Sequence, residues 1–146
     1  MNLLQNIKDL LPYTRPFLFV DELLEINENG VKGTYTFRKD EYFYQGHLPN
    51  NPITPGVILI ETMAQIGLVT LGMFLIKAHE NPQPVDFAFS SSEVEFLKMV
   101  LPEEKVWVQS EKVYFRFGKL KCRVVMTNAA GEKVCKGHLS GMIVKK

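Results

Sequence analysis

The sequence predicts an α+β protein in which an antiparallel β-sheet curls around one long central helix. Residues 57–76 are almost entirely apolar, too many for one strand, and follow Pro55-Gly56. This pair suits a helix start, because the N–H that proline lacks would have no partner there. Segments of strand character joined by short turns flank the helix on both sides. Such a sheet has one face that needs covering, and only this helix is apolar enough to cover it.

The other elements follow in a simple order along the chain. A short amphipathic helix is followed by a hairpin that turns at Asn27-Glu28-Asn29-Gly30, then by the central helix and an antiparallel meander. Turns at Gly118 and at residues 128–131 divide the last part of the meander. The predicted ranges are 3–10 for the first helix, 17–26 and 31–37 for the hairpin, 57–76 for the central helix, and 85–96, 105–117, 119–127 and 133–144 for the meander.

Composition indicates one domain covering residues 1–146. A chain of 146 residues with 46% apolar content can bury a sizeable core without subdivision, and it contains no linker or repeat. The net charge of +1, spread along the chain, gives no reason to expect a nucleic-acid partner. The first ten residues lack the basic start of a signal peptide, so we expect a cytoplasmic location, in which Cys122 and Cys135 would be reduced thiols.

The central segment is also long enough to cross a bilayer, so a membrane span is an alternative. Against it, Glu61, Gln65 and two glycines interrupt the apolar run. A carboxylate near the bilayer centre costs about 2.5–3.5 kcal/mol. We therefore expect a core helix surrounded by protein and no membrane span.

Glu61 is a candidate acid. Its neighbours are hydrocarbon, so the ionised form would lose solvation, and we expect a raised pKa and a proton retained near neutrality. Gln65 follows four positions later, on the same face of the helix, where its side chain can hydrogen-bond to the acid and orient it.

His47 is a candidate base. It lies in a loop between the aromatic residues 42–44 and the prolines at 49, 52 and 55, which favour a shaped apolar environment. A loop histidine is more often a structural hydrogen-bonding group than a base, but the nearby acid favours catalysis. His79 fits a structural role at the end of the central helix, and His138 fits a solvated strand face.

Three blocks of sequence resemble the FabZ-type β-hydroxyacyl-acyl carrier protein dehydratases. They occur in the family's order and span almost the whole chain, with fourteen positions from the histidine to the acid. The blocks are Leu11-Pro12 with Pro16 to Asp21, Gly46-His47-Leu48-Pro49 with Pro55-Gly56-Val57, and Glu61-Thr62-Met63-Ala64-Gln65.

The resemblance implies the hot-dog fold, in which a long helix lies inside an antiparallel sheet. It also implies a homodimer, with further association into three dimers left open, in which His47 faces Glu61 of the partner subunit. The implied reaction dehydrates a 3-hydroxyacyl thioester on acyl carrier protein without a cofactor or metal. His47 would take the C2 proton, Glu61 would protonate the leaving hydroxyl, and the N–H groups of Gly56 and Val57 would bind the thioester oxygen.

Other positions are candidates for substrate and partner contacts. Besides Gln65 beside the acid, an acyl tunnel is expected along Ile60, Ala64, Leu68, Phe87 and Phe89, although each of these suits an ordinary core equally well. Because acyl carrier protein is acidic, Arg15, Lys98 and Lys77 are candidates for its docking surface.

Departures from the family pattern affect the substrate more than the reaction. They are Leu48, Asn50 and Thr54 near the histidine, Arg15 before Pro16, and Glu103-Glu104 after Pro102. Three alternatives stay open: a hot-dog thioesterase, a FabA-type enzyme that also isomerises the double bond, and a non-catalytic acyl-binding module. The FabA group usually carries aspartate as the acid, so Glu61 favours simple dehydration.

Overall fold

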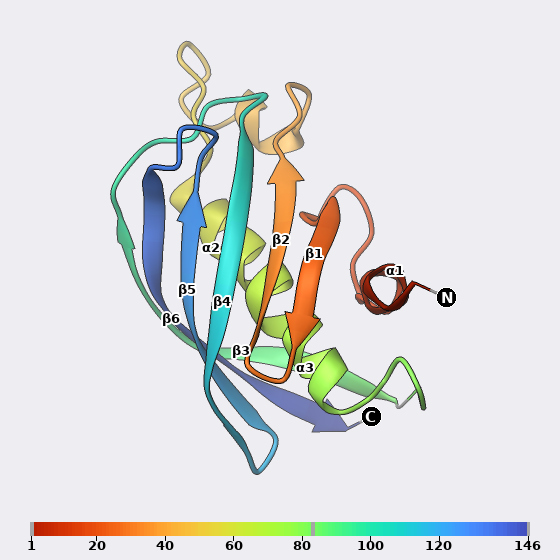
Figure 1. Cartoon of the computed structure of the whole chain (residues 1–146). Coiled ribbons are helices and arrows are strands. Elements are labelled where there is room, and N and C mark those ends of the chain that lie inside the picture. The colour runs from red at the N-terminus through yellow and green to blue at the C-terminus, as the bar shows by residue number, and fades with distance from the viewer. Residues whose placement is uncertain (1, 83, 146) are drawn as a thin grey trace.

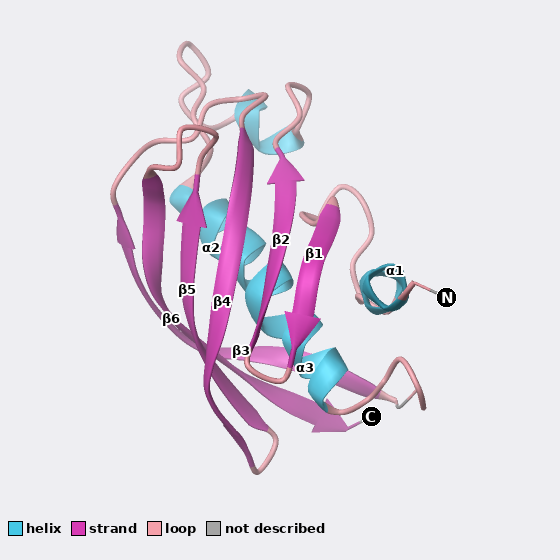
Figure 2. Cartoon of the chain, in the orientation of Figure 1, coloured by secondary structure: helices cyan, strands magenta, loops and turns pink. Residues whose placement is uncertain are grey.

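The computed structural model describes residues 2–82 and 84–145 of the chain. A short helix precedes a hairpin, the long helix follows, and four more strands complete the fold (Figures 1 and 2). The elements are α1 (Leu3–Asp9), β1 (Glu22–Asn27), β2 (Gly30–Thr36), the 3-10 helix η1 (Tyr42–Gln45), α2 (Gly56–Ala64), the π-helix η2 (Gln65–Val69), α3 (Thr70–Leu75), β3 (Val85–Phe96), β4 (Lys105–Arg116), β5 (Lys119–Thr127) and β6 (Lys133–Lys145).

The six strands form one antiparallel sheet in the order β1-β2-β4-β5-β6-β3. The sheet curls around the continuous helix made by α2, η2 and α3, which lies against its inner face (Figure 1). The predicted α+β class, with a sheet wrapped around a long central helix, is confirmed.

The central helix contacts the sheet closely at positions without a side chain. A Cβ on Gly67 would lie 3.1 Å from the Cβ of Ser110, and a Cβ on Gly72 would lie 1.9 Å from Cζ of Phe87. A side chain on the helix at either position would be too close to these atoms, so glycine permits the close packing. The two glycines that interrupt the apolar run therefore allow the helix to pack against β3 and β4.

The central helix is long and apolar enough for a membrane span, with a mean hydropathy of 1.8 over Gly56–Leu75. Nevertheless, 78% of the most apolar 18-residue window in this helix is buried inside the protein. This burial is what a core helix in a folded domain shows.

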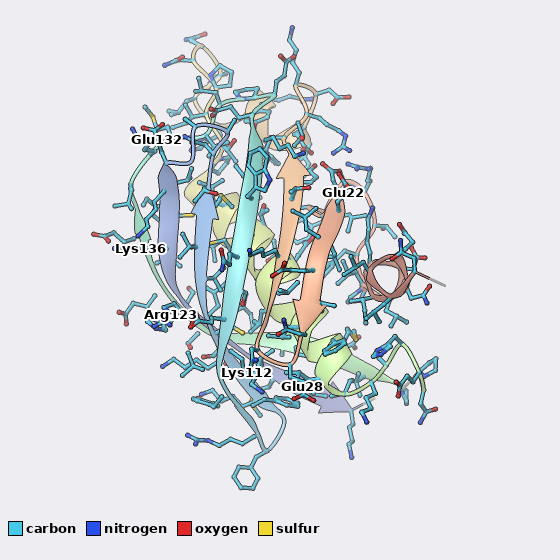
Figure 3. The ribbon with its side chains drawn as sticks, in the orientation of Figure 1. Glu22, Glu28, Lys112, Arg123, Glu132 and Lys136 are labelled. Atoms are coloured by element: carbon cyan, nitrogen blue, oxygen red, sulfur yellow. The ribbon has the colours of Figure 1, made fainter. Side chains whose placement is uncertain are left out.

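The outer face of the sheet is charged. Figure 3 shows Arg123 on β5 and Lys136 on β6 projecting away from the central helix. Arg123 pairs with Glu111, and Lys136 lies 3.9 Å from Glu95. Polar residues outside and apolar residues inside give the sheet a single buried face.

One predicted strand is shorter than expected. Residues 17–21 were expected to begin the first strand, but β1 begins at Glu22. The backbone N–H of Phe19 donates to the side chain of Gln65 at 2.8 Å, and the backbone oxygen of Phe17 accepts from it at 2.9 Å. The central helix therefore supplies the partners that a neighbouring strand would otherwise supply.

Candidate active site

His47 follows the η1 turn and is held by two backbone hydrogen bonds. Its backbone N–H donates to the backbone oxygen of Phe43 at 3.0 Å. Its ring nitrogen Nδ1 lies 3.0 Å from the backbone oxygen of Ile53. A carbonyl oxygen can only accept, so Nδ1 carries the hydrogen in this contact. The neutral ring then has its lone pair on Nε2, which is the nitrogen that can take a proton.

The far side of the His47 loop is attached to its neighbours by two further contacts. Tyr44 and Thr54 share a hydrogen bond of 2.6 Å between their hydroxyls, and both side chains are buried. The N–H of Thr54 donates to the backbone oxygen of Val100 at 2.8 Å. These contacts therefore fix the C-terminal end of the proline-rich loop.

A polar network fixes the start of the η1 turn. The hydroxyl of Tyr35 donates to the carboxylate of Glu41, whose side chain also accepts from the N–H of Arg38 at 3.2 Å. The Arg38 guanidinium donates to the Tyr35 hydroxyl at 2.9 Å and to Asp21 at 3.1 Å. Because Tyr35 and Glu41 are buried, this network holds the chain that leads to His47.

Glu61 lies on α2, and its carboxylate accepts a hydrogen bond of 3.0 Å from Nε2 of Gln65. Gln65 is fully buried, and its other contacts fix its orientation: its oxygen accepts from the N–H of Phe19 and its nitrogen donates to the oxygen of Phe17. The nitrogen must therefore face the acid. Gln65 begins the π-helical turn η2, a type of turn often found at functional sites.

Burial raises the pKa of Glu61 above its ordinary value, and the hydrogen bond from Gln65 opposes part of this rise. The direction agrees with the prediction from the apolar sequence around the acid. A carboxyl group with a raised pKa keeps its proton at higher pH and is better suited to donate it.

Glu61 borders a cavity of about 220 Å³ between the helix and β3. The predicted tunnel residues Ala64, Leu68, Phe87 and Phe89 line it, whereas the described lining does not include Ile60, which packs partly buried against the core. The remaining lining residues are Tyr13, Phe17, Val69 and Ala88.

Sequence reasoning missed Tyr13 and Phe17 because they precede the sheet. The strap formed by residues 13–17 reaches the cavity through the hydrogen bond between Phe17 and Gln65. No local pattern in the sequence predicts that contact, which joins residues 48 positions apart. Ala88 lies between two predicted tunnel residues on β3, where strand alternation places it on the opposite face, so spacing alone does not predict it.

Gly56 and Val57 begin α2, where backbone N–H groups have no partner within the helix. The side chain of Val57 is 73% exposed. A Cβ on Gly56 would lie 3.0 Å from the ring of Phe96. Glycine at this position therefore lets the aromatic ring of β3 approach the helix start.

His47 is not among the described residues that line the cavity beside Glu61. Within one chain, then, the structure places the acid, Gln65 and most tunnel candidates together but leaves the histidine outside that group. In residues 2–82 and 84–145, no three His, Cys, Asp or Glu side chains are grouped so that they could hold a metal ion.

The basic candidates for docking lie on the surface and two are paired. The Arg15 guanidinium is 3.8 Å from Asp21, and the Lys98 ammonium is 3.0 Å from Glu132. Lys77 is exposed just after α3. Of the other histidines, His79 stacks on Phe74 with ring centroids 5.4 Å apart, and His138 is exposed on β6.

The sheet wrapped around a helix, with a partly buried acid beside an apolar cavity, defines a hot-dog protein. Solved structures share this fold: a dehydratase heterocomplex from Xenorhabdus doucetiae has a TM-score of 0.81 at 15% identity, covering 100% of this chain and 94% of that chain. A thioesterase from Haemophilus influenzae has a TM-score of 0.69 at 12% identity, covering 99% and 92%. Identities this low show the fold alone.

Sequence comparison identifies the family. The model of the FabA-like domain matches residues 11–137. The 3-hydroxyacyl-[acyl-carrier-protein] dehydratase FabZ of Caldicellulosiruptor bescii is 35% identical over 93% of this chain and 94% of its own length. FabZ of Acinetobacter baylyi is 36% identical over 85% of this chain and 83% of its own length. The chain belongs to the FabA-like family and is related to its FabZ dehydratases over nearly its whole length.

Proposed function

We propose that this protein is a 3-hydroxyacyl-[acyl-carrier-protein] dehydratase of fatty acid or related acyl biosynthesis. The observation that carries the proposal is the hydrogen-bonded pair of partly buried Glu61 and fully buried Gln65 beside an apolar cavity. The FabZ relatives, named for this reaction, support the same activity. The substrate is a (3R)-3-hydroxyacyl thioester and the product a trans-2-enoyl thioester.

His47 acts as the general base. The contact between its Nδ1 and the Ile53 oxygen leaves Nε2 as the nitrogen with the lone pair. This nitrogen takes the weakly acidic C2 proton of the substrate. The ring contact to Ile53 and the backbone hydrogen bond to Phe43 together orient the ring toward the substrate.

Glu61 acts as the general acid. Its raised pKa favours the protonated form, which donates its proton to the C3 hydroxyl, and this group leaves as water. Gln65 fixes the carboxyl group through Nε2. Burial thus separates the roles of the two groups: Glu61 donates a proton and His47 accepts one.

The thioester carbonyl binds at the start of α2. Negative charge develops on its oxygen when C2 loses a proton, and the N–H groups of Gly56 and Val57 supply donors at the positive end of the helix dipole. The acyl chain then runs into the cavity beside Glu61, along Ala64, Leu68, Phe87 and Phe89.

The active unit is a homodimer in which His47 faces Glu61 of the partner subunit. Two observations support this arrangement: His47 is outside the described cavity lining, and β3 is a 12-residue strand at the edge of the sheet. An edge strand of this length presents a row of backbone groups that a second copy can pair with. Pairing there would bring a second chain next to the cavity, which β3 borders.

Acyl carrier protein is the partner that delivers the substrate, in the cytoplasm and without a membrane span in this chain. The exposed basic residues Arg15 and Lys98 form part of its docking surface, with Lys77 as a further candidate. The ion pairs they make with Asp21 and Glu132 are exposed, so these cations can exchange partners at little cost.

Enoyl thioesters on carrier protein and on coenzyme A test the activity. Ultraviolet absorbance follows the loss of enoyl conjugation during hydration, while a thiol reagent follows release of the thiol. The proposal predicts loss of conjugation without thiol release. Thiol release would assign a thioesterase, and no change with any chain length would assign a binding module.

A further inference from the structure

Tyr13 lies in the same cavity as Glu61 but comes from a distant part of the chain. Its side chain is partly buried, and its ring lies 6.5 Å from that of Phe17. The backbone oxygen of Phe17 accepts a hydrogen bond from Gln65, whose side chain also donates to Glu61. The strap formed by residues 13–17 therefore places a phenol beside the acid through the same glutamine that orients the acid.

The Tyr13 phenol keeps its proton and is available as a hydrogen-bond donor. Burial raises its pKa to about 12, and the negative charge of Glu61, which lines the same cavity, adds to the rise. Within the described residues this hydroxyl has no assigned hydrogen bond, whereas the hydroxyls of Tyr35 and Tyr44 both have partners. A phenol oxygen in an apolar cavity ordinarily has one.

The two carboxylate oxygens of Glu61 differ in their contacts. Oε2 accepts the hydrogen bond from Gln65, so Oε1 is the oxygen better suited to carry the proton. When the acid gives this proton to the leaving hydroxyl, Oε1 becomes an anionic oxygen. Within the described residues no protein donor to Oε1 is assigned, and a donor from the cavity lining would stabilise the anion of this partly buried group.

We propose that the Tyr13 hydroxyl donates a hydrogen bond to Oε1 of ionised Glu61 and so sets the strength of the acid. Tyr13 is a positioning residue in this role and keeps its own proton throughout. The proton of Glu61 passes to the C3 hydroxyl, the C3–O bond breaks, and water leaves. The catalytic meaning of this contact rests on the proposed dehydratase function, but the contact itself does not.

The test is a titration of Glu61 by NMR in protein labelled with ¹³C at glutamate carboxyl carbons. Loss of one resonance in Glu61→Gln assigns the group, and no substrate is needed. Removing a donor from the charged form raises the pKa of an acid. In Tyr13→Phe we expect the pKa of Glu61 to rise by about one unit, a shift typical of losing a specific partner. Tyr42→Phe is the matched control, because Tyr42 is 46% exposed and outside the cavity lining.

An unchanged Glu61 pKa in Tyr13→Phe overturns the proposal, because a purely structural ring would leave the titration where it is. With the shift, kcat for dehydration of a 3-hydroxyacyl thioester should fall several-fold, since a weaker acid transfers its proton to the leaving hydroxyl more slowly. If the wild-type protein proves inactive on every enoyl thioester, the dehydratase proposal fails while the titration result stands. The two failures are therefore distinguishable.

Discussion

The His47 loop and the Glu61 turn are positioned in different ways. His47 is held by backbone groups of Phe43 and Ile53, four and six positions away in the chain. Glu61 is held by Gln65, which in turn depends on backbone groups 46 and 48 positions away. The base is thus placed mainly by local turns and the acid by the packing of the helix against the N-terminal strap.

This difference has consequences for substitution. A locally held loop should tolerate loss of its histidine side chain without unfolding, whereas loss of a buried amide leaves partners unsatisfied across the fold. Activity and stability should therefore separate at His47 and change together at Gln65.

The largest expected effect is at His47. Replacing it with alanine should lower kcat/KM by about 10²–10⁴-fold, the range for loss of a general base. The unfolding midpoint should stay close to that of the wild type, since the side chain makes a single hydrogen bond. Hydratase rates with thermal unfolding measure both quantities, with the exposed His138→Ala as the control. Substantial activity in His47→Ala would remove the proposed base.

Gln65→Leu should reduce stability and activity together. The substitution leaves the Phe19 N–H and the Phe17 oxygen without their partner, at a cost on the order of 3 kcal/mol in the free energy of unfolding. Denaturant unfolding measures this loss. Gln109→Leu, an exposed position on β4, should change stability by less than about 0.5 kcal/mol. Equal effects of the two substitutions would contradict the role of the buried amide.

Gly72→Ala should disturb the cavity from the side of the helix. The new Cβ would lie 1.9 Å from Cζ of Phe87, so the ring must move, and Phe87 lines the cavity. Overpacking of this kind costs about 1–3 kcal/mol. We expect KM for long acyl chains to rise more than KM for crotonyl substrates. A uniform change across chain lengths would argue against acyl binding along Phe87.

The smallest expected effect is a pH dependence of stability that comes from Glu61. Its folded-state pKa is raised, so the stabilisation linked to its proton is complete below the unfolded pKa and is lost as pH rises through the folded value. Glu61→Gln removes this loss. The variant should gain stability relative to the wild type as pH rises from 4 to 8. Calorimetry at both pH values checks the sign, and a gain at pH 4 instead would contradict it.

Much of the fold follows from local pattern. The ranges of β3 and β5 agree with the predicted strands, and the central helix begins at Gly56 as expected. The irregular course of residues 17–19 before β1 could not be predicted. The backbone groups of Phe17 and Phe19 bond to a side chain 48 and 46 positions away rather than to a strand. The π-helical turn at Gln65 likewise leaves no signature in apolar periodicity.

The candidate site was predictable in type but only partly in membership. An acid in an apolar helix predicts a raised pKa, and the direction is confirmed. The cavity is lined by Ala64, Leu68, Phe87 and Phe89. These four could be predicted from helical and strand spacing, because they lie on elements that face each other. Tyr13 needed the three-dimensional structure. The roles of His47, Glu61, Gly56 and Val57 in catalysis stay predictions.

Mixing two inactive variants tests most directly whether His47 acts with Glu61 of the partner subunit. His47→Ala and Glu61→Gln homodimers are dissociated, mixed in equal amounts and reassociated. If sites form across the interface, each mixed dimer contains one intact site, and random pairing should restore about a quarter of the wild-type activity. If each chain carries its own complete site, the mixture should be as inactive as its components, and that result would contradict a site shared between subunits.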